Sequence, residues 1–129
     1  MTAEAMLKAF RQLGYQARHI VLTGGEPCLY DLRELTRALI EQGYQIQIET
    51  SGTHEIQADP SCWVTLSPKL EMKGGFEVLD SALARANEIK HPVAMEKHIE
   101  QLDHLLARCH QGKGKVIALQ PISQQPRAT

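Results

Sequence analysis

The chain contains 129 residues, of which 43% are hydrophobic and 22% charged, and its formal net charge is −1. These values are typical of one globular domain, and they exclude intrinsic disorder and collagen-like or coiled-coil composition. The near-neutral charge argues against a protein that coats nucleic acid, and no apolar run approaches the roughly 20 residues needed to cross a bilayer. A complete (β/α)₈ barrel needs at least about 200 residues, so the length also excludes that fold in complete form.

The N-terminal segment and the cysteines predict a cytoplasmic protein. Glu4 and a helical pattern of apolar residues distinguish the N-terminal segment from a secretory signal peptide. Cys28, Cys62 and Cys109 are odd in number and widely spaced, which indicates reduced thiols. We interpret them as small, buried or half-buried side chains and expect no metal ligands among them.

A first helix and strand are predicted at the N-terminal end. Apolar residues recur with helical spacing from residue 2 to residue 13, and Gly14 is a typical residue for the end of a helix. The run HIVLTGG that follows is short and apolar and ends in two glycines, which indicates a buried strand.

A second helix and strand follow. Asp31 and Glu34 have the spacing of a capping box, and the leucines behind them continue with helical spacing until Gly43. In QIQIETSG, the isoleucines would lie on one side of a strand, and the glutamines with Glu49 on the other. A polar row of this kind suits the lumen of a barrel that contacts a polar ligand.

The second half of the chain repeats the alternation. We predict strands at WVTLSPK, NEIKHPV and KVIALQPI, and helices from Phe76 to about Ala86 and from Met95 to about Cys109. The last helix should turn four apolar residues inward, namely Ile99, Leu102, Leu105 and Leu106. Its three histidines should lie in solvent, namely His98, His104 and His110. The alternation predicts an α/β fold with a parallel sheet, organised as a single domain over residues 1–129.

The candidate functional residues gather where the predicted strands end. Ligands bind beyond the carboxyl ends of parallel strands, and here those ends read TGGEP, ETSG, SPK, KHP and QPIS. Gly24 and Gly25 leave backbone amides unshielded, and the Glu26 carboxylate could accept bonds from a cationic ligand group. A tight turn that merely requires glycines is the alternative interpretation of the same residues.

The other strand ends also allow two interpretations. Glu49 at the mouth of the polar row could contact a ligand or be satisfied by a buried lysine or backbone donors. Lys69 could meet a ligand carboxylate or hydroxyl, or lie on the surface beside a turn. Lys90 and His91 could reach an anionic substrate or form a solvated pair, and Gln120 could bind a ligand or the backbone of a loop.

Five stretches taken together resemble the radical S-adenosylmethionine (SAM) family, and within it the 7-carboxy-7-deazaguanine synthases. They are HIVLTGGEPC, QIETSGTHE, WVTLSPKLEMKGGFEVL, ANEIKHPV and KVIALQPISQ, from about His19 to Gln124. The resemblance implies an incomplete parallel (β/α) barrel of radical SAM type. It also implies a cytoplasmic lyase of queuosine biosynthesis that acts on a small-molecule pterin.

The same resemblance implies the chemistry and its cofactors. In this family a [4Fe–4S] cluster and SAM generate a deoxyadenosyl radical, which starts the Mg²⁺-assisted conversion of 6-carboxy-5,6,7,8-tetrahydropterin to 7-carboxy-7-deazaguanine. Three residues match the motif that holds the SAM amino group, namely Gly24, Gly25 and Glu26, and Thr23 matches a position near the substrate. Further positions match the lining of the SAM pocket, namely Ser51, Ser67, Pro68, Lys69 and Gln120.

The chain also departs from the family pattern. The CxxxCxxC motif whose thiolates hold the cluster is absent from the 129 residues. The family's substrate-binding arginine and Mg²⁺-contacting threonine belong to the same unmatched part, and its C-terminal helix and strand are unmatched as well. We therefore assign no catalytic residue and no metal ligand, and we expect these residues alone to be inactive.

Two alternatives stay open at this point. The GGEP motif occurs in other radical SAM enzymes such as activating enzymes, and a non-catalytic module that binds SAM or a protein partner could retain the same motifs. We expect no nucleic-acid or membrane partner. An incomplete barrel exposes strand edges, which favours a homodimer or a larger assembly.

Overall fold

The computed structural model describes residues 2–14, 16–68, 77–108 and 115–121 of the chain. The first half contains helix α1 (Ala3–Leu13), strand β1 (His19–Leu22), the 3₁₀ turn η1 (Pro27–Leu29), helix α2 (Arg33–Glu41) and strand β2 (Gln45–Thr50). The second half contains strand β3 (Trp63–Leu66), helix α3 (Asp80–Arg85), strand β4 (Glu88–Val93), helix α4 (Glu96–Ala107) and strand β5 (Val116–Pro121). The predicted alternation of helices and strands is confirmed.

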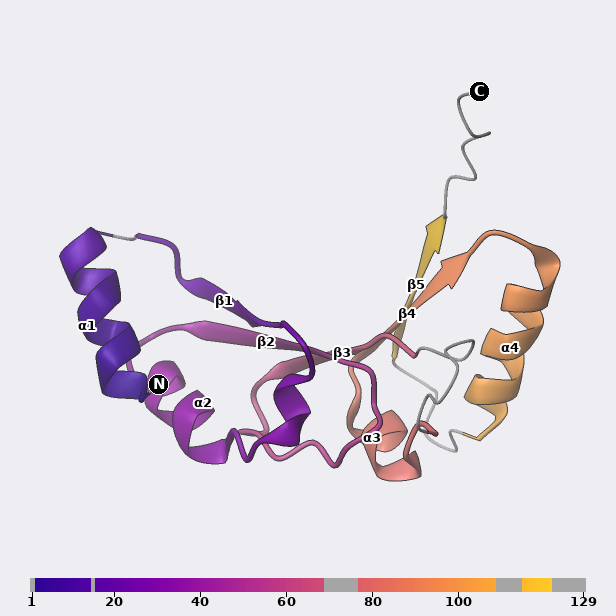
Figure 1. The fold of residues 1–129 in the computed structure, drawn as a ribbon, viewed down its shortest axis with the longest axis horizontal. Coiled ribbons are helices and arrows are strands. Elements are labelled where there is room, and N and C mark those ends of the chain that lie inside the picture. Colours follow the sequence, from indigo (N-terminus) through magenta and orange to yellow (C-terminus); the bar gives the residue numbers. More distant parts are fainter. Residues whose placement is uncertain (1, 15, 69–76, 109–114, 122–129) are drawn as a thin grey trace, which may run out of the picture.

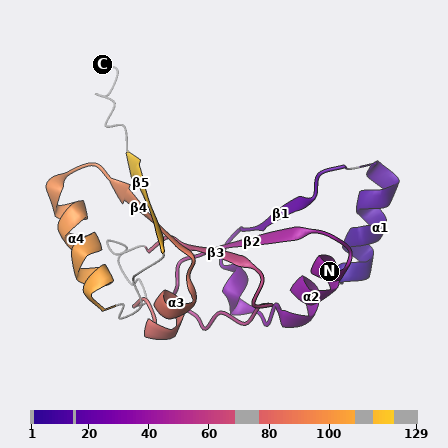
Figure 2. The same ribbon diagram turned by 180° about the vertical axis from the view of Figure 1, so that it is seen from behind.

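The five strands form one parallel sheet, and their order in space is their order in the chain. The sheet is twisted and open, with α1 and α2 near β1 and β2 at one end and α4 beside β4 at the other (Figures 1 and 2). Consecutive parallel strands without a reversal of order are typical of βα barrels, whereas doubly wound sheets reverse at a switch point. The predicted α/β fold is confirmed, and its geometry is consistent with part of a barrel.

The hydrophobic core lies between the helices and one face of the sheet, which we call the outer face. The strands contribute Ile46, Ile48, Val64, Leu66 and Ile89, and the helices contribute Leu39, Ala82, Leu83, Leu102 and Leu105. Burial of one such leucine or isoleucine stabilises the fold by about 1.5–3 kcal/mol, so this layer holds the helices to the sheet. The predicted alternation in β2 is confirmed, because both isoleucines are buried here while Gln45, Gln47 and Glu49 are not.

Strand β1 is only half buried, so the prediction of a buried strand is wrong. Ile20 and Leu22 pack against the core, but His19 is exposed and Val21 is 42% exposed on the opposite face. In the described sheet, β1 pairs with β2 alone, and no described element covers its second face. An apolar run indicates that a strand can be buried, but it does not say how many of its faces are covered.

Two helices begin differently from the prediction. Helix α2 starts at Arg33 after Leu32, whose side chain makes no capping bond, so the capping box is absent. The Asp31 carboxylate instead accepts the Arg33 N–H at 3.0 Å and forms an ion pair with the Arg33 guanidinium at 2.6 Å. Helix α3 starts at Asp80, and Phe76, where we placed the start, lies outside the described residues.

Helix α4 turns Leu102 and Leu105 to the core as predicted, and Leu106 packs partly against it. Ile99 is 37% exposed, which corrects its predicted inward position. The stripe that meets the sheet begins instead at His98, one residue earlier, and this spacing rotates Ile99 to the flank of the helix.

His98 is buried, so its predicted exposure is wrong. Its Nδ1 atom accepts the backbone N–H groups of Ala94 and Met95 at 2.9 and 3.2 Å, which caps the start of α4. Its ring also meets that of His91 edge-on at 6.4 Å between centroids. His104 is exposed as predicted, and His110 lies outside the described residues. None of the helices in the described part of the chain is long and apolar enough to cross a membrane.

Candidate functional site

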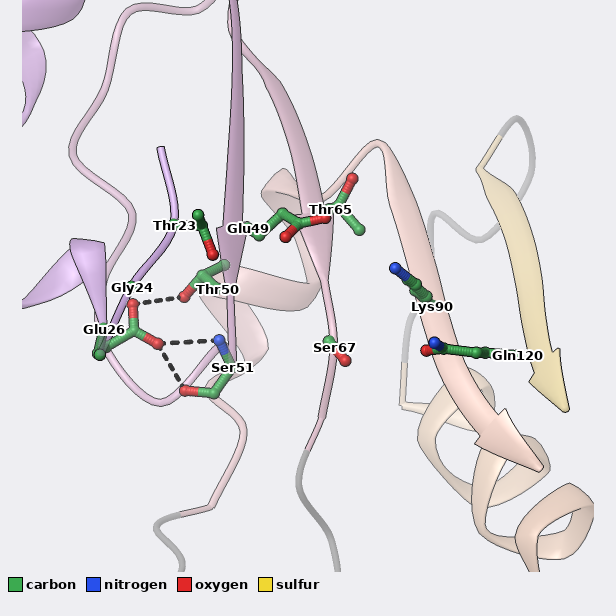
Figure 3. Close-up of a pocket in the computed structure, with 11 residues that line it drawn as sticks. Thr23, Gly24, Glu26, Glu49, Thr50, Ser51, Thr65, Ser67, Lys90 and Gln120 are labelled. Carbon is green, nitrogen blue, oxygen red and sulfur yellow. Dashed lines mark hydrogen bonds between the residues drawn. The ribbon is translucent and has the colours of Figure 1, made fainter. Parts of the chain in front are cut away.

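The carboxyl ends of the strands surround a cavity of about 190 Å³ (Figure 3). Its lining comes from the ends of β1 to β5 and the turns behind them: Thr23, Gly24, Gly25, Glu26, Glu49, Thr50, Ser51, Thr65, Ser67, Lys90 and Gln120. Most of the strand-end residues singled out from the sequence therefore lie around one space. Pro68 is buried and does not line it, and Lys69 lies outside the described residues.

The Glu26 carboxylate joins the end of β1 to the end of β2. Its Oε1 atom accepts the Ser51 N–H at 2.9 Å and the Ser51 hydroxyl at 2.7 Å. Its Oε2 atom accepts the Thr50 hydroxyl at 2.9 Å and the Cys28 N–H at 2.8 Å. Figure 3 shows the carboxylate turned toward Thr50 and Ser51 across the turn.

These four bonds define the role of Glu26 in the site. A carboxylate offers about four acceptor positions, and each Glu26 oxygen already accepts two hydrogen bonds within the chain. In this structure the Glu26 side chain thus forms a hydrogen-bonded link between two strand ends. The surface that faces a ligand at this turn is mainly backbone.

The glycines before Glu26 leave that backbone open. Gly24 has a φ angle of 123°, a conformation that residues with a side chain rarely adopt. A Cβ atom added at Gly24 or at Gly25 would meet no other atom within 4 Å. The turn therefore offers unshielded peptide groups at the edge of the cavity, as the sequence predicts.

Two ionisable groups in this turn have displaced pKa values. Burial opposes ionisation of Glu26, but the hydrogen bonds from Ser51, Cys28 and Thr50 outweigh it and lower the Glu26 pKa below its usual range. Burial raises the pKa of the neighbouring Cys28 thiol, and the Glu26 carboxylate raises it further. Cys28 is therefore a buried thiol whose ionisation is disfavoured.

The remaining predicted residues lie at different sides of the cavity. Thr23 is exposed at the end of β1, beside the glycine turn. Ser67 is partly buried at the end of β3, and its N–H donates to the Thr50 carbonyl at 2.8 Å. Gln120 on β5 stands next to Lys90 on the side opposite Glu26 (Figure 3).

A row of hydrogen-bonded side chains crosses the face of the sheet away from the helices, which we call the inner face. His19 Nε2 donates to Gln47 Oε1 at 3.0 Å, and Gln47 Nε2 donates to Thr65 Oγ1 at 3.2 Å. Thr65 then donates to Glu88 Oε1 at 2.7 Å, and that oxygen also accepts the Trp63 indole N–H at 3.3 Å. Thr65 in this row also lines the cavity, so the row connects the cavity to the polar side chains of the inner face.

The sequence pattern indicates only part of this row. The alternation of QIQIE placed Gln47 on the polar side of its strand, but Thr65 and Glu88 carried no separate signal. Their place follows from the register, in which Glu49 lies beside Thr65 and Thr65 beside Glu88. The period of two in the later strands could have placed both residues on the inner face once that register was known.

Lys90 and His91 point to opposite faces of β4. Lys90 lines the cavity, whereas His91 is buried against α4 on the outer face. The interpretation of the two residues as one solvated or substrate-facing pair is therefore wrong, because neighbouring residues of a strand alternate between its faces.

The described residues contain no group of three His, Cys, Asp or Glu side chains that could hold a metal ion. Cys28 and Cys62 are free and buried, as predicted, and burial raises the pKa of both thiols. Cys109 lies outside the described residues. This donor set does not fit an iron–sulfur cluster, whereas the open glycine turn fits a ligand that binds peptide groups.

Comparison with known proteins places the chain beside one group of enzymes. It is 57% identical over 128 residues to the 7-carboxy-7-deazaguanine synthase of Escherichia coli (strain K12), covering 99% of this chain and 57% of the relative. It is 45% identical over 114 residues to that of Buchnera aphidicola, covering 88% and 50%. No family model matches the sequence.

A solved structure gives the same result for the fold. The crystal structure of QueE from Escherichia coli superposes with a TM-score of 0.92 at 56% identity, covering 98% of this chain and 55% of that one. The chain thus spans a little over half the length of the relatives that it matches. The resemblance to this family inferred from the motifs is confirmed over the part that the chain covers.

The first prediction concerns the hydrogen bonds of the Glu26 carboxylate. Glu26→Gln should lower the free energy of unfolding at pH 7 by about 1–2 kcal/mol, because the new amide NH₂ must face two of the four donors. The lowered Glu26 pKa means that the ionised carboxylate stabilises the fold above pH 4.5, the ordinary value, and that this stability is lost as the pH falls through the Glu26 pKa. Urea unfolding of the unaltered chain and of Glu26→Gln, at several pH values between about 3 and 7, measures the difference in their free energies of unfolding above and below about pH 4.5.

Glu100→Gln provides the matched control, because Glu100 is exposed on α4 and does not line the cavity. Its effect should stay within about 0.5 kcal/mol at every pH. A stability difference for Glu26→Gln that does not narrow at low pH would contradict the role assigned to the ionised carboxylate.

Proposed function

Because this chain shares the sequence and fold of 7-carboxy-7-deazaguanine synthases over the part that it covers, we propose that it supplies the SAM-binding part of such an enzyme. The whole enzyme would convert 6-carboxy-5,6,7,8-tetrahydropterin to 7-carboxy-7-deazaguanine in queuosine biosynthesis, in the cytoplasm. The observation that carries the proposal is the open glycine turn at Gly24 and Gly25 beside a polar cavity at the strand ends.

The glycine turn would bind the ammonium end of SAM through its peptide carbonyl groups. Gly24 and Gly25 admit close approach because nothing lies within 4 Å of either added Cβ atom. Glu26 acts from behind the turn, where its four bonds hold the ends of β1 and β2 in a fixed relation. We treat Glu26 as a positioning residue whose charge also favours a cationic ligand nearby.

The rest of the cavity would receive the other parts of the ligands. Ser51 and Ser67 supply hydroxyl groups suited to ribose hydroxyls, and Gln120 supplies an amide group for a further polar part of SAM. Thr23, which is exposed and lines the cavity, would contact the pterin. Lys69 and Pro68 keep the role that the resemblance implies, although Pro68 does not reach the cavity surface.

The cluster and Mg²⁺ are part of the proposal for the whole enzyme only. With SAM and a [4Fe–4S] cluster, enzymes of this kind carry out hydrogen abstraction, and the described residues offer no donor set for either metal centre. We therefore assign these 129 residues the binding and orientation of SAM and not its cleavage. A non-catalytic SAM-binding module is the second candidate, favoured by the same lack of cluster ligands.

The second prediction is that the chain binds SAM through the glycine turn. Isothermal titration should give a micromolar dissociation constant, and Gly25→Val should raise it at least about tenfold by covering the peptide groups. Gly25 lacks a positive φ angle and has free space around its added Cβ, so the substitution should leave the fold intact. Absence of binding at millimolar SAM would contradict the proposed function.

Gly14→Ala is the matched control for this substitution. Gly14 also has free space around an added Cβ atom, but it ends α1 and does not line the cavity. Its affinity for SAM should equal that of the unaltered chain, although its φ angle of 68° makes the substitution cost about 1 kcal/mol of stability. Equal losses of affinity in both variants would place the binding site elsewhere.

We also propose that the chain forms a homodimer or a larger assembly. In the described sheet β1 and β5 each pair with one strand only, so one edge of each is open. Ile117 and Leu119 of β5 lie on the outer face but are 40% and 52% exposed. An open edge bordered by apolar side chains favours association with further strands.

The third prediction follows from that edge. Sedimentation velocity at micromolar concentration should show dimers or larger species, and Leu119→Lys should shift them toward monomer because it places a charge beside the open edge. Leu13→Lys, which alters an exposed leucine at the end of α1, should leave the distribution unchanged. A clean monomer for the unaltered chain would refute self-association.

A further inference from the structure

Resting on the proposed function, we propose that Lys90 is the carboxylate-binding residue of the cavity. Lys90 lines the cavity from β4 and is half-buried. No hydrogen bond or ion pair joins its ammonium group to any other residue that the structure describes. Figure 3 shows the side chain leaving β4 with its ammonium end on the side of β3, where Thr65 and Ser67 lie.

The neighbours of Lys90 explain why it stays available to a ligand. Glu88, two residues earlier on the same face, accepts the Thr65 hydroxyl at 2.7 Å and the Trp63 indole at 3.3 Å and is thus turned toward β3. Glu49 lies beside Thr65 on β2, with β3 between it and β4. A half-buried ammonium loses part of its hydration, and no described carboxylate pairs with it to offset that loss. An anionic ligand group bound at Lys90 would offset it.

The charges of the cavity restrict the kind of anion. Glu26 and Glu49 line the β1–β2 side and Lys90 lines the β4 side, so among the described lining residues two carboxylates face one cation. A phosphate dianion would be repelled by two carboxylates, whereas a ligand with a positive end and a single carboxylate matches both sides. Gln120 beside Lys90 adds amide donors for the same carboxylate.

Two ligands of the proposed reaction carry such a group, namely the methionine part of SAM and the 6-carboxylate of the pterin. The common chemistry is one carboxylate held by the Lys90 ammonium, with Gln120 as a neutral second donor. This assignment gives Lys90 a specificity role, because a ligand without the carboxylate would leave the ammonium half-buried and uncompensated.

The test is a double-mutant-type cycle, in which the Lys90 charge and the ligand carboxylate are removed separately and together. The dissociation constants of SAM and decarboxylated SAM, and of 6-carboxypterin and unsubstituted pterin, are measured for the unaltered chain and for Lys90→Met. For the acid that Lys90 binds, the substitution should raise the constant about 10- to 100-fold, while the matching ligand without the carboxylate changes less than about twofold. Selective loss in the SAM pair or in the pterin pair identifies the source of the carboxylate.

Controls separate charge from folding. Lys90→Arg should retain most of the affinity, and Lys8→Met, on the exposed surface of α1, should retain all of it. Two results would overturn the role of Lys90 and leave the proposed function standing. Lys90→Met could lose equal affinity for the acids and for the ligands without the carboxylate, or it could lose no affinity while SAM still binds the unaltered chain. Failure of the unaltered chain to bind any of the four ligands would overturn both.

Discussion

Four donors from two strand ends converge on the Glu26 carboxylate, and the shape of the cavity depends on that convergence. Parallel strands are held together along their length by the sheet, but the turns beyond them have no ladder of their own. Glu26 supplies the missing connection between the turn after β1 and the end of β2. The glycine turn can therefore stay free of side chains and still keep a defined conformation.

The two faces of the sheet divide structure from function. Aliphatic side chains on the outer face hold the helices, while the row from His19 to Glu88 keeps the inner face polar and rigid. Strands β1 to β4 contribute to both tasks because their residues alternate between the faces. This division explains how β4 can bury His91 against α4 and present Lys90 to the cavity from adjacent positions.

The sequence predicted local features well and long-range contacts poorly. The alternation of polar and apolar residues in QIQIE and the two glycines of TGGEP are local patterns. The polar side of β2 and the open turn could therefore be predicted from them. The bonds of Glu26 to Thr50 and Ser51 span 24 and 25 residues and depend on strand register, which no local pattern reveals. The same reason explains why β1 was expected to be buried and His98 to be solvated.

We propose above all that these 129 residues bind and orient SAM without cleaving it. The direct measurement is anaerobic incubation of the chain with iron, sulfide, a reductant and SAM, followed by separate quantification of protein-bound SAM and released deoxyadenosine. We expect SAM bound in stoichiometric amount, no stable cluster absorption and no deoxyadenosine above the protein-free control. Deoxyadenosine formed in proportion to the chain would contradict this proposal.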